Sequence, residues 1–200
     1  MDFGSFIGGT ATEVSDDSVE TVRDYGFYRM SKLVHLSLPA ATSIGQYAFE
    51  TCSALGSVSL PKVEKIGQYA FQRCSSLESV VLPAVTNFGG NVFAYCTALK
   101  VVDIHKRVAF SYDLFKGSNA LITLILRATD RISAGVNTQY GPFGADSPIV
   151  KGTGYIYVPA SLLDTYKADA YWSAFSGQFR ALESYTVDGT TTGELDASKI

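Results

Sequence analysis

A 22-residue repeat constrains the fold of this chain more than any other feature. Residues 44–55 read IGQYAFETCSAL, and residues 66–77 read IGQYAFQRCSSL. A unit of this length cannot bury its own apolar side chains, whereas copies stacked on one another can. The period therefore predicts a solenoid in which equivalent residues of successive units form columns along one axis.

Apolar residues recur at this spacing in several columns, and each column extends over at least five units. The columns end only after residue 126 or 132, so we expect no insertion or deletion between residues 22 and 132. Three of them are Phe27, Phe49, Phe71, Phe93 and Phe115; Leu33, Leu55, Leu77, Leu99 and Leu121; and Leu38, Leu60, Leu82, Ile104 and Leu126.

Each unit contains the signals of two short strands. Apolar Val58 and Leu60 alternate with serines, which predicts a half-buried strand that ends at Pro61. Ile66 and Gly67 predict a second short strand followed by a turn, with the glycine supplying permissive backbone. Residues 69–74 are too few for an independent helix, so we expect one turn of 3₁₀ or α helix there.

The period changes after residue 132. Phe143 continues the column of Phe115, but it comes six positions later than the repeat would place it, which predicts an insertion of that length within residues 133–142. A second insertion is expected at the turn signature of residues 151–154. Residues 155–159, YIYVP, then repeat the strand-and-proline pattern.

A different pattern closes the chain. Apolar residues are spaced by three or four positions, as on a helix, at Trp172, Phe175, Phe179 and Leu182. Because a solenoid needs an end that hides its last apolar edge, we expect a helical cap with Trp172 packed on the last coil. A tryptophan in a sugar-binding site is the alternative. The predicted organisation is an N-terminal flank (1–21), a solenoid of about six coils (22–159), a helical cap (160–184) and a polar tail or linker (185–200).

The repeat unit resembles the BspA-like leucine-rich-repeat family, of the type found on surfaces and in phages. Residues 55–76, LGSVSLPKVEKIGQYAFQRCSS, carry the likeness best, and it extends over residues 22–126. The resemblance implies a β-rich (α+β) solenoid with parallel strands along one face and short 3₁₀ or helical turns. It also implies a surface protein of bacteria or a phage tip protein that binds proteins or glycans without catalysis. His105 and Arg127 depart from the pattern, because they stand where the repeat has proline.

Composition excludes several other classes of protein. A net charge of −3 and a pI near 5.3 do not suit a nucleic-acid binder, which carries a basic stripe. No apolar run approaches the roughly 18 residues that span a membrane. The N-terminus lacks the basic and apolar regions of a signal peptide. If the chain acts outside the cell or in a virion, we therefore expect it to do so as part of a longer protein.

The sequence contains no catalytic or metal-binding constellation. Cys52, Cys74 and Cys96 recur at one position of successive repeats, where other units have Met30 and Ser118, so we expect reduced, buried thiols that act as fillers. A zinc site would need closely spaced pairs. We therefore predict a protein without enzymatic activity, metal or cofactor. The acidic residues Glu13, Asp16 and Asp17 suit calcium or simply a solvated turn.

Strand alternation predicts where a partner binds. The outward-facing positions are small and polar in early units and become apolar in later ones, at Val81, Val101 and Ile125, beside Asp103 and Thr123. An exposed apolar cluster rimmed by polar groups marks an interaction site. The alternative is that residues 133–142 or a neighbouring molecule cover it. Two functions stay open: a module that recognises a host or bacterial surface protein or glycan, as a monomer or weak homo-oligomer, or a structural spacer with no ligand of its own.

Overall fold

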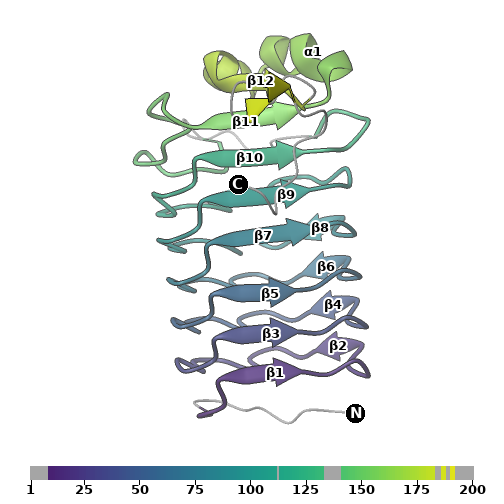
Figure 1. The fold of residues 1–200 in the computed structure, drawn as a ribbon, viewed down its shortest axis with the longest axis vertical. Coiled ribbons are helices and arrows are strands. Elements are labelled where there is room, and N and C mark those ends of the chain that lie inside the picture. Colours follow the sequence, from purple (N-terminus) through teal and green to yellow (C-terminus); the bar gives the residue numbers. More distant parts are fainter. Residues whose placement is uncertain (1–8, 112, 133–140, 183–185, 188–189, 192–200) are drawn as a thin grey trace.

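The computed structural model describes residues 9–111, 113–132, 141–182, 186–187 and 190–191. The chain winds into a rod of stacked coils, and each coil contributes one strand to the same wall (Figure 1). The strands of this wall are β1 (Glu13–Ser15), β3 (His35–Ser37), β5 (Ser57–Ser59), β7 (Ser79–Leu82), β9 (Val101–Ile104), β10 (Thr123–Leu126), β11 (Tyr155–Val158) and β12 (Phe179–Ala181).

The strand register follows the repeat and confirms the predicted solenoid. The paired strands of this wall are parallel, and His35 lies opposite Ser57, its equivalent in the next repeat. Thr123 lies opposite Tyr155, which places the extra residues of both predicted insertions between β10 and β11. Residues 133–140 of the first insertion lie outside the described residues. Glu13 lies opposite His35, so the ladder begins at β1, nine residues before Val22, where the solenoid was predicted to start.

A second wall holds the other short strands. These are β2 (Thr21–Val22), β4 (Ser43–Ile44), β6 (Lys65–Ile66) and β8 (Asn87–Phe88), which pair in that order. A glycine follows each of the last three strands. A Cβ on Gly67 would lie 2.6 Å from the backbone nitrogen of Gln46, closer than atoms can approach. Close packing between coils therefore requires this glycine, rather than the permissive backbone that we expected.

The predicted helical turn at residues 69–74 is wrong. Tyr69 and Arg73 have φ values of 60°, in the left-handed region that a right-handed helix excludes. Three amides donate to the next coil instead of along the segment: Tyr69 to Gly90, Phe71 to Val92 and Arg73 to Ala94. None of the described coils before residue 159 contains a helix, because these tight turns exchange hydrogen bonds between coils.

The core lies between the two walls and the turns. Phe49 and Phe71 stack with ring centroids 5.1 Å apart and planes 7° apart, and the stack continues to Phe93 and Phe115. Phe143 continues it after the insertion, at 6.0 Å from Phe115. This contact confirms the lengthened step that the sequence predicted.

The cap is only partly helical. It comprises η1 (Ala160–Leu162), α1 (Leu163–Ala168) and η2 (Ser173–Gln178), and then the strand β12. Trp172 is fully buried and contacts Phe110 and Phe179, which confirms the predicted packing on the last coils. A continuous helix through Phe179 is wrong, because Phe179 begins β12 and pairs with Ile156. The cap thus supplies one more strand to the ladder.

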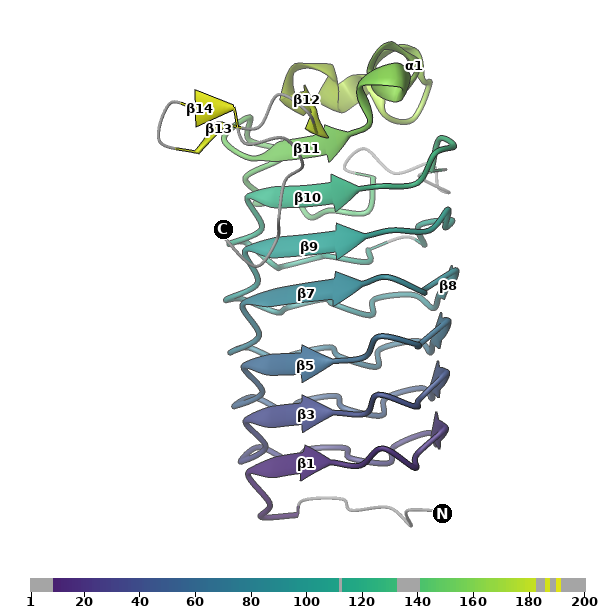
Figure 2. The same ribbon diagram turned by 45° about the vertical axis from the view of Figure 1, so that its right-hand side comes forward.

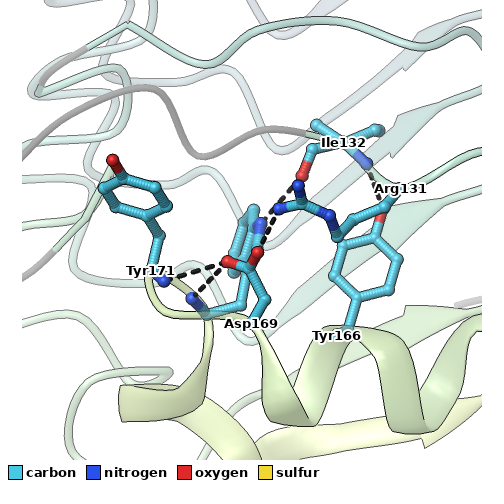
Figure 3. Close-up of polar contacts among 6 residues, drawn as sticks. Arg131, Ile132, Tyr166, Asp169 and Tyr171 are labelled. Carbon is cyan, nitrogen blue, oxygen red and sulfur yellow. Dashed lines mark hydrogen bonds and ion pairs between the residues drawn. The ribbon is translucent and has the colours of Figure 1, made fainter.

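Polar groups attach the cap to the solenoid (Figure 3). The hydroxyl oxygen of Tyr166 accepts a hydrogen bond of 2.7 Å from the amide of Ile132. The indole nitrogen of Trp172 donates to the carbonyl oxygen of Ile132 at 2.8 Å. Asp169 forms an ion pair with Arg131 and also accepts a hydrogen bond from the amide of Trp172. Both backbone groups of Ile132 therefore find partners in the cap.

The predicted tail begins with a short antiparallel pair. β13 (Thr186–Val187) pairs with β14 (Thr190–Thr191) within the range 185–200. Residues 192–200, and residues 1–8 of the predicted flank, lie outside the described residues.

Candidate binding surfaces

The structure corrects the predicted binding surface. Val81 is exposed, with 42% of its surface accessible. The other four predicted residues are buried: Val101, Asp103, Thr123 and Ile125. The strand register is as expected, since the alternate residues Val102 and Leu124 belong to the main core. The outward face of β9 and β10 is therefore covered, not free.

The described part of the cover comes from the C-terminal cap. Leu182, which directly follows β12, packs with Val101 and Ile125, and Tyr157 adjoins them. The alternation within the strands could not reveal this contact, because Leu182 lies beyond the last repeat.

Charged groups sit beside this covered patch. Asp103 is 2% exposed, and its carboxylate accepts two hydrogen bonds from Nε of Arg127, at 2.9 and 3.0 Å. Nε2 of His105 lies 3.3 Å from the same carboxylate. These partners occupy the two positions where the repeat has proline elsewhere. Arg127, one of these two departures from the repeat, thus supplies the counter-charge for a carboxylate that the cover buries.

The outward face of the first four strands is small and polar. His35 and Ser57 lie opposite each other, with Nδ1 2.7 Å from the hydroxyl oxygen. Ser59 and Ser79 are also exposed. With few apolar or charged groups, this half offers a hydroxyl-rich surface that ends at Val81.

A row of tyrosines along the turns is a second surface, which the sequence patterns above did not predict. Tyr25, Tyr47 and Tyr69 stack at 4.9 Å between ring centroids. Tyr25 forms the outer end of the stack and is 44% exposed. In the sequence, the signal for this row is the tyrosine of the repeated motif IGQYAF, at Tyr47 and Tyr69.

Charged groups accompany the tyrosines. The guanidinium of Arg29 lies 5.1 Å from the ring centroid of Tyr28, and that of Arg73 lies 5.8 Å from that of Tyr95. Burial raises the pKa of Glu50 between them, although Arg73 and Arg29 oppose this rise. Burial also raises the pKa of Tyr47, and its two stacked neighbours add to the effect. The aromatic edge, defined as these eight residues, combines rings and opposite charges: Tyr25, Tyr28, Arg29, Tyr47, Glu50, Tyr69, Arg73 and Tyr95.

The groups with potential reactivity lie elsewhere. Cys52, Cys74 and Cys96 are free and buried, and burial raises the pKa of Cys52 and of Cys96 to about 12. Thiols in this state are poor nucleophiles. Asp16 accepts hydrogen bonds from the amide and hydroxyl of Ser18, which lower its pKa. Across the described residues, no three His, Cys, Asp or Glu side chains are placed to hold a metal ion.

The described part of the chain contains no helix with both the length and the apolar character that crossing a bilayer requires.

Comparison with known proteins extends the likeness seen in the sequence. The model of the BspA type leucine rich repeat region matches residues 10–127 in six copies. No curated protein matches the chain significantly. The start of this match near β1 agrees with a ladder that begins at β1.

One solved structure shares the fold, and two others are similar to a lesser degree. The pneumococcal vaccine antigen PcpA superimposes with a TM-score of 0.65 at 19% identity, over 86% of this chain and 40% of that one. The T. pallidum leucine rich repeat protein TpLRR reaches a TM-score of 0.48 at 26% identity, over 68% of this chain and 74% of that one. A leucine rich cell surface protein of Faecalibacterium prausnitzii gives 0.40 at 18% identity, over 83% and 51%. The chain thus spans less than half the length of PcpA.

Proposed function

The chain belongs to the BspA type leucine-rich repeat family, and on that premise we propose that it is a non-catalytic recognition module that binds a protein partner through the aromatic edge. The module acts at a cell or virion surface as part of a larger assembly. The likeness to a pneumococcal vaccine antigen supports this location. The family supplies the scaffold, and the aromatic edge supplies the specificity.

The observation that carries this proposal is the stacked tyrosine row with arginines beside it. Tyrosine and arginine are the residues most enriched in the energetic centres of protein interfaces, together with tryptophan. Stacking between coils holds the rings in place, so binding orders few side chains and loses little conformational entropy. The exposed Tyr25, Arg29 and Arg73 are the residues that a partner contacts first.

The experiment compares charge-reversed variants for binding to surfaces. The fluorescently labelled chain is tested on host epithelial cells, on bacterial cells and on a glycan array. The double variant Arg29→Glu, Arg73→Glu should lose binding at least tenfold. Lys62→Glu serves as the control, because Lys62 is exposed on a different edge of the coil. Equal loss in the control, or no effect in the double variant, contradicts the proposal.

Other results of the same experiment distinguish a module that binds a glycan from a structural spacer. Binding that survives protease treatment of the cells and follows a defined glycan on the array identifies a glycan ligand. A spacer is the alternative function, and the continuous core of stacked coils suits it, because a rod with a stiff core holds other domains apart. A chain that binds none of these surfaces supports the spacer.

A further inference from the structure

The strand ladder is interrupted at one point. The wall divides into a sheet of β1, β3 and β5 and a sheet of β7, β9, β10, β11 and β12, so β5 and β7 are not hydrogen-bonded neighbours. Figure 2 shows the wider separation of these two strands. On the opposite wall β6 and β8, from the same two coils, remain paired. Between these two coils, the strands are therefore unpaired in one wall of the rod and paired in the other.

Backbone groups line this gap. The amide of Ser57 donates to Val34 and the carbonyl oxygen of Ser59 accepts from Leu38, so both serines face β3. In a parallel ladder successive residues direct their backbone groups to opposite edges. The N–H and C=O of Val58 therefore face β7. Among the described residues, no backbone hydrogen bond joins β5 to β7.

The facing edge belongs to β7. The carbonyl oxygens of Glu78 and Leu82 accept hydrogen bonds from the coil of β9, so these residues face away from the gap. By the same alternation, the backbone groups of Ser79 and Val81 face β5. The two edges thus present alternating N–H and C=O dipoles that are not bonded to each other across the gap.

A groove follows the gap on the outer surface. Its volume is about 180 Å³, and its lining is Val58, Ser59, Leu60, Pro61, Val81 and Pro83. Val58 is half-buried, whereas Leu36 and Val80, at the same position of adjacent repeats, are each 2% exposed. Apolar side chains are thus accessible where the two strands do not pair.

We propose that this gap binds an extended peptide segment of a partner protein, which adds a strand between β5 and β7. The dipoles of a peptide backbone complement the row of N–H and C=O groups on both edges, as in other cases of strand addition. An apolar side chain of the peptide fills the groove between Pro61 and Pro83. Alternating β-branched residues suit the inserted strand, since they favour extended backbone.

Insertion changes the shape of the rod. Strands in a sheet lie about 4.8 Å apart, so β5 and β7 separate to about 9.6 Å when a strand enters. The paired β6 and β8 then act as the hinge, and the rod bends away from the open wall. This inference stands apart from recognition by the aromatic edge, and neither depends on the other.

Hydrogen exchange of the full chain, followed by NMR, tests the proposal. The free chain should exchange the Val58 amide at least about tenfold faster than those of Leu36 and Val80, whose strands are paired. The probe is the peptide acetyl-Lys-Thr-Val-Thr-Val-Thr-Val-Lys-amide at millimolar concentration. It should slow exchange at Val58, Ser79 and Val81 by a similar factor. The same peptide N-methylated at both its threonines and its valines should have no effect, because neither of its edges can then pair with a strand.

A disulfide cross-link between β5 and β7 provides a second test of the proposal. The oxidised variant Ser59→Cys, Val81→Cys joins β5 to β7 and closes the gap, since a disulfide requires Cα atoms about 4.4–6.8 Å apart. Peptide protection should vanish in this variant and return on reduction. The control Ser37→Cys, Ser59→Cys joins strands that already pair and should leave protection intact. Slow exchange of Val58 in the free chain, no protection by the peptide, or protection that persists after cross-linking overturns the proposal.

Discussion

The thiol of Cys74 donates a hydrogen bond to the carbonyl oxygen of Phe49, 3.2 Å away in the preceding coils. The column that we expected to act only as filler therefore also donates hydrogen bonds to buried backbone acceptors. The same contact recurs from Cys52 to Phe27, from Cys96 to Phe71 and, through its hydroxyl, from Ser118 to Phe93.

Substitution of Cys74 separates the two roles of this column. Cys74→Ala removes this donor, while the Phe49 carbonyl keeps its hydrogen bond from the amide of Cys52, so the loss should be about 0.5–1.5 kcal/mol of unfolding free energy. Cys74→Ser should cost less, because Ser118 makes the same contact at its own repeat position. Urea denaturation measures both values. Equal losses in the two variants would mean that volume alone matters.

The buried thiols also predict a loss of stability at high pH. Burial raises the pKa of Cys52 and Cys96 from 9.0 to about 12 and raises that of Cys74 as well. Between pH 9 and 12 the unfolded chain loses these protons while the native state keeps them, so the free energy of unfolding falls as pH rises. The fall should be smaller in the triple Cys→Ser variant. Matching slopes for the two proteins between pH 8 and 11 would contradict this.

Glycine substitutions test the close packing of coils. Gly67→Ala places a Cβ against the backbone of the preceding coil and should destabilise the protein by more than about 2 kcal/mol. Gly56→Ala is the matched control, because no atom would lie closer than 3.9 Å to a Cβ at this position, and it should change stability by less than about 0.5 kcal/mol. Thermal melts of both variants suffice, and similar melting temperatures would contradict the packing.

The covered strand face predicts a stability effect instead of a binding effect. Val101→Ser with Ile125→Ser should destabilise the chain by several kcal/mol, because both side chains are buried against Leu182. Leu182→Ser should lower stability less and increase binding of a hydrophobic dye, since it uncovers the patch. Val81→Ser is the control, because Val81 is exposed. Unchanged denaturation of the double variant would mean that this face is free in solution.

The attachment of the cap depends on Tyr166. Tyr166→Phe keeps the ring but leaves the buried amide of Ile132 without an acceptor, at a cost of about 1–3 kcal/mol. Proteolysis should then release the cap faster than in the native chain. Tyr171→Phe is the control, because the Tyr171 side chain is 51% exposed. Comparable digestion of the two variants would exclude this role for the hydroxyl.

The repeat period alone predicted the solenoid, its register and its core, because columns such as Phe27 to Phe115 report contacts between equivalent residues. The same logic located the insertion before Phe143. Rules that apply to single short segments predicted less of the structure correctly. Residues 69–74 have a helical length, but the left-handed Tyr69 and Arg73 direct their amides to the next coil.

The features missed are those that break the symmetry of the repeat. Leu182 covers Val101 from outside the repeat, so no periodic pattern predicts it. The gap between β5 and β7 falls where the repeats match best, because a change in coil spacing involves backbone geometry and not residue type. Phe179 fitted a helical spacing and still became a strand, because the last coil offered it an open edge.

The hydrogen bonds between coils give this rod a mechanical direction. Those of the turns and of the strands point along the axis, as in the donation from Tyr47 to Gln68. A force applied between the two ends therefore loads them one after another, and the coils peel off singly instead of resisting together in shear. Each coil released in this way lengthens the chain by one repeat, the stretch that separates His35 from its partner Ser57. A protein of this design yields in small steps and keeps the rest of its length folded while it does so.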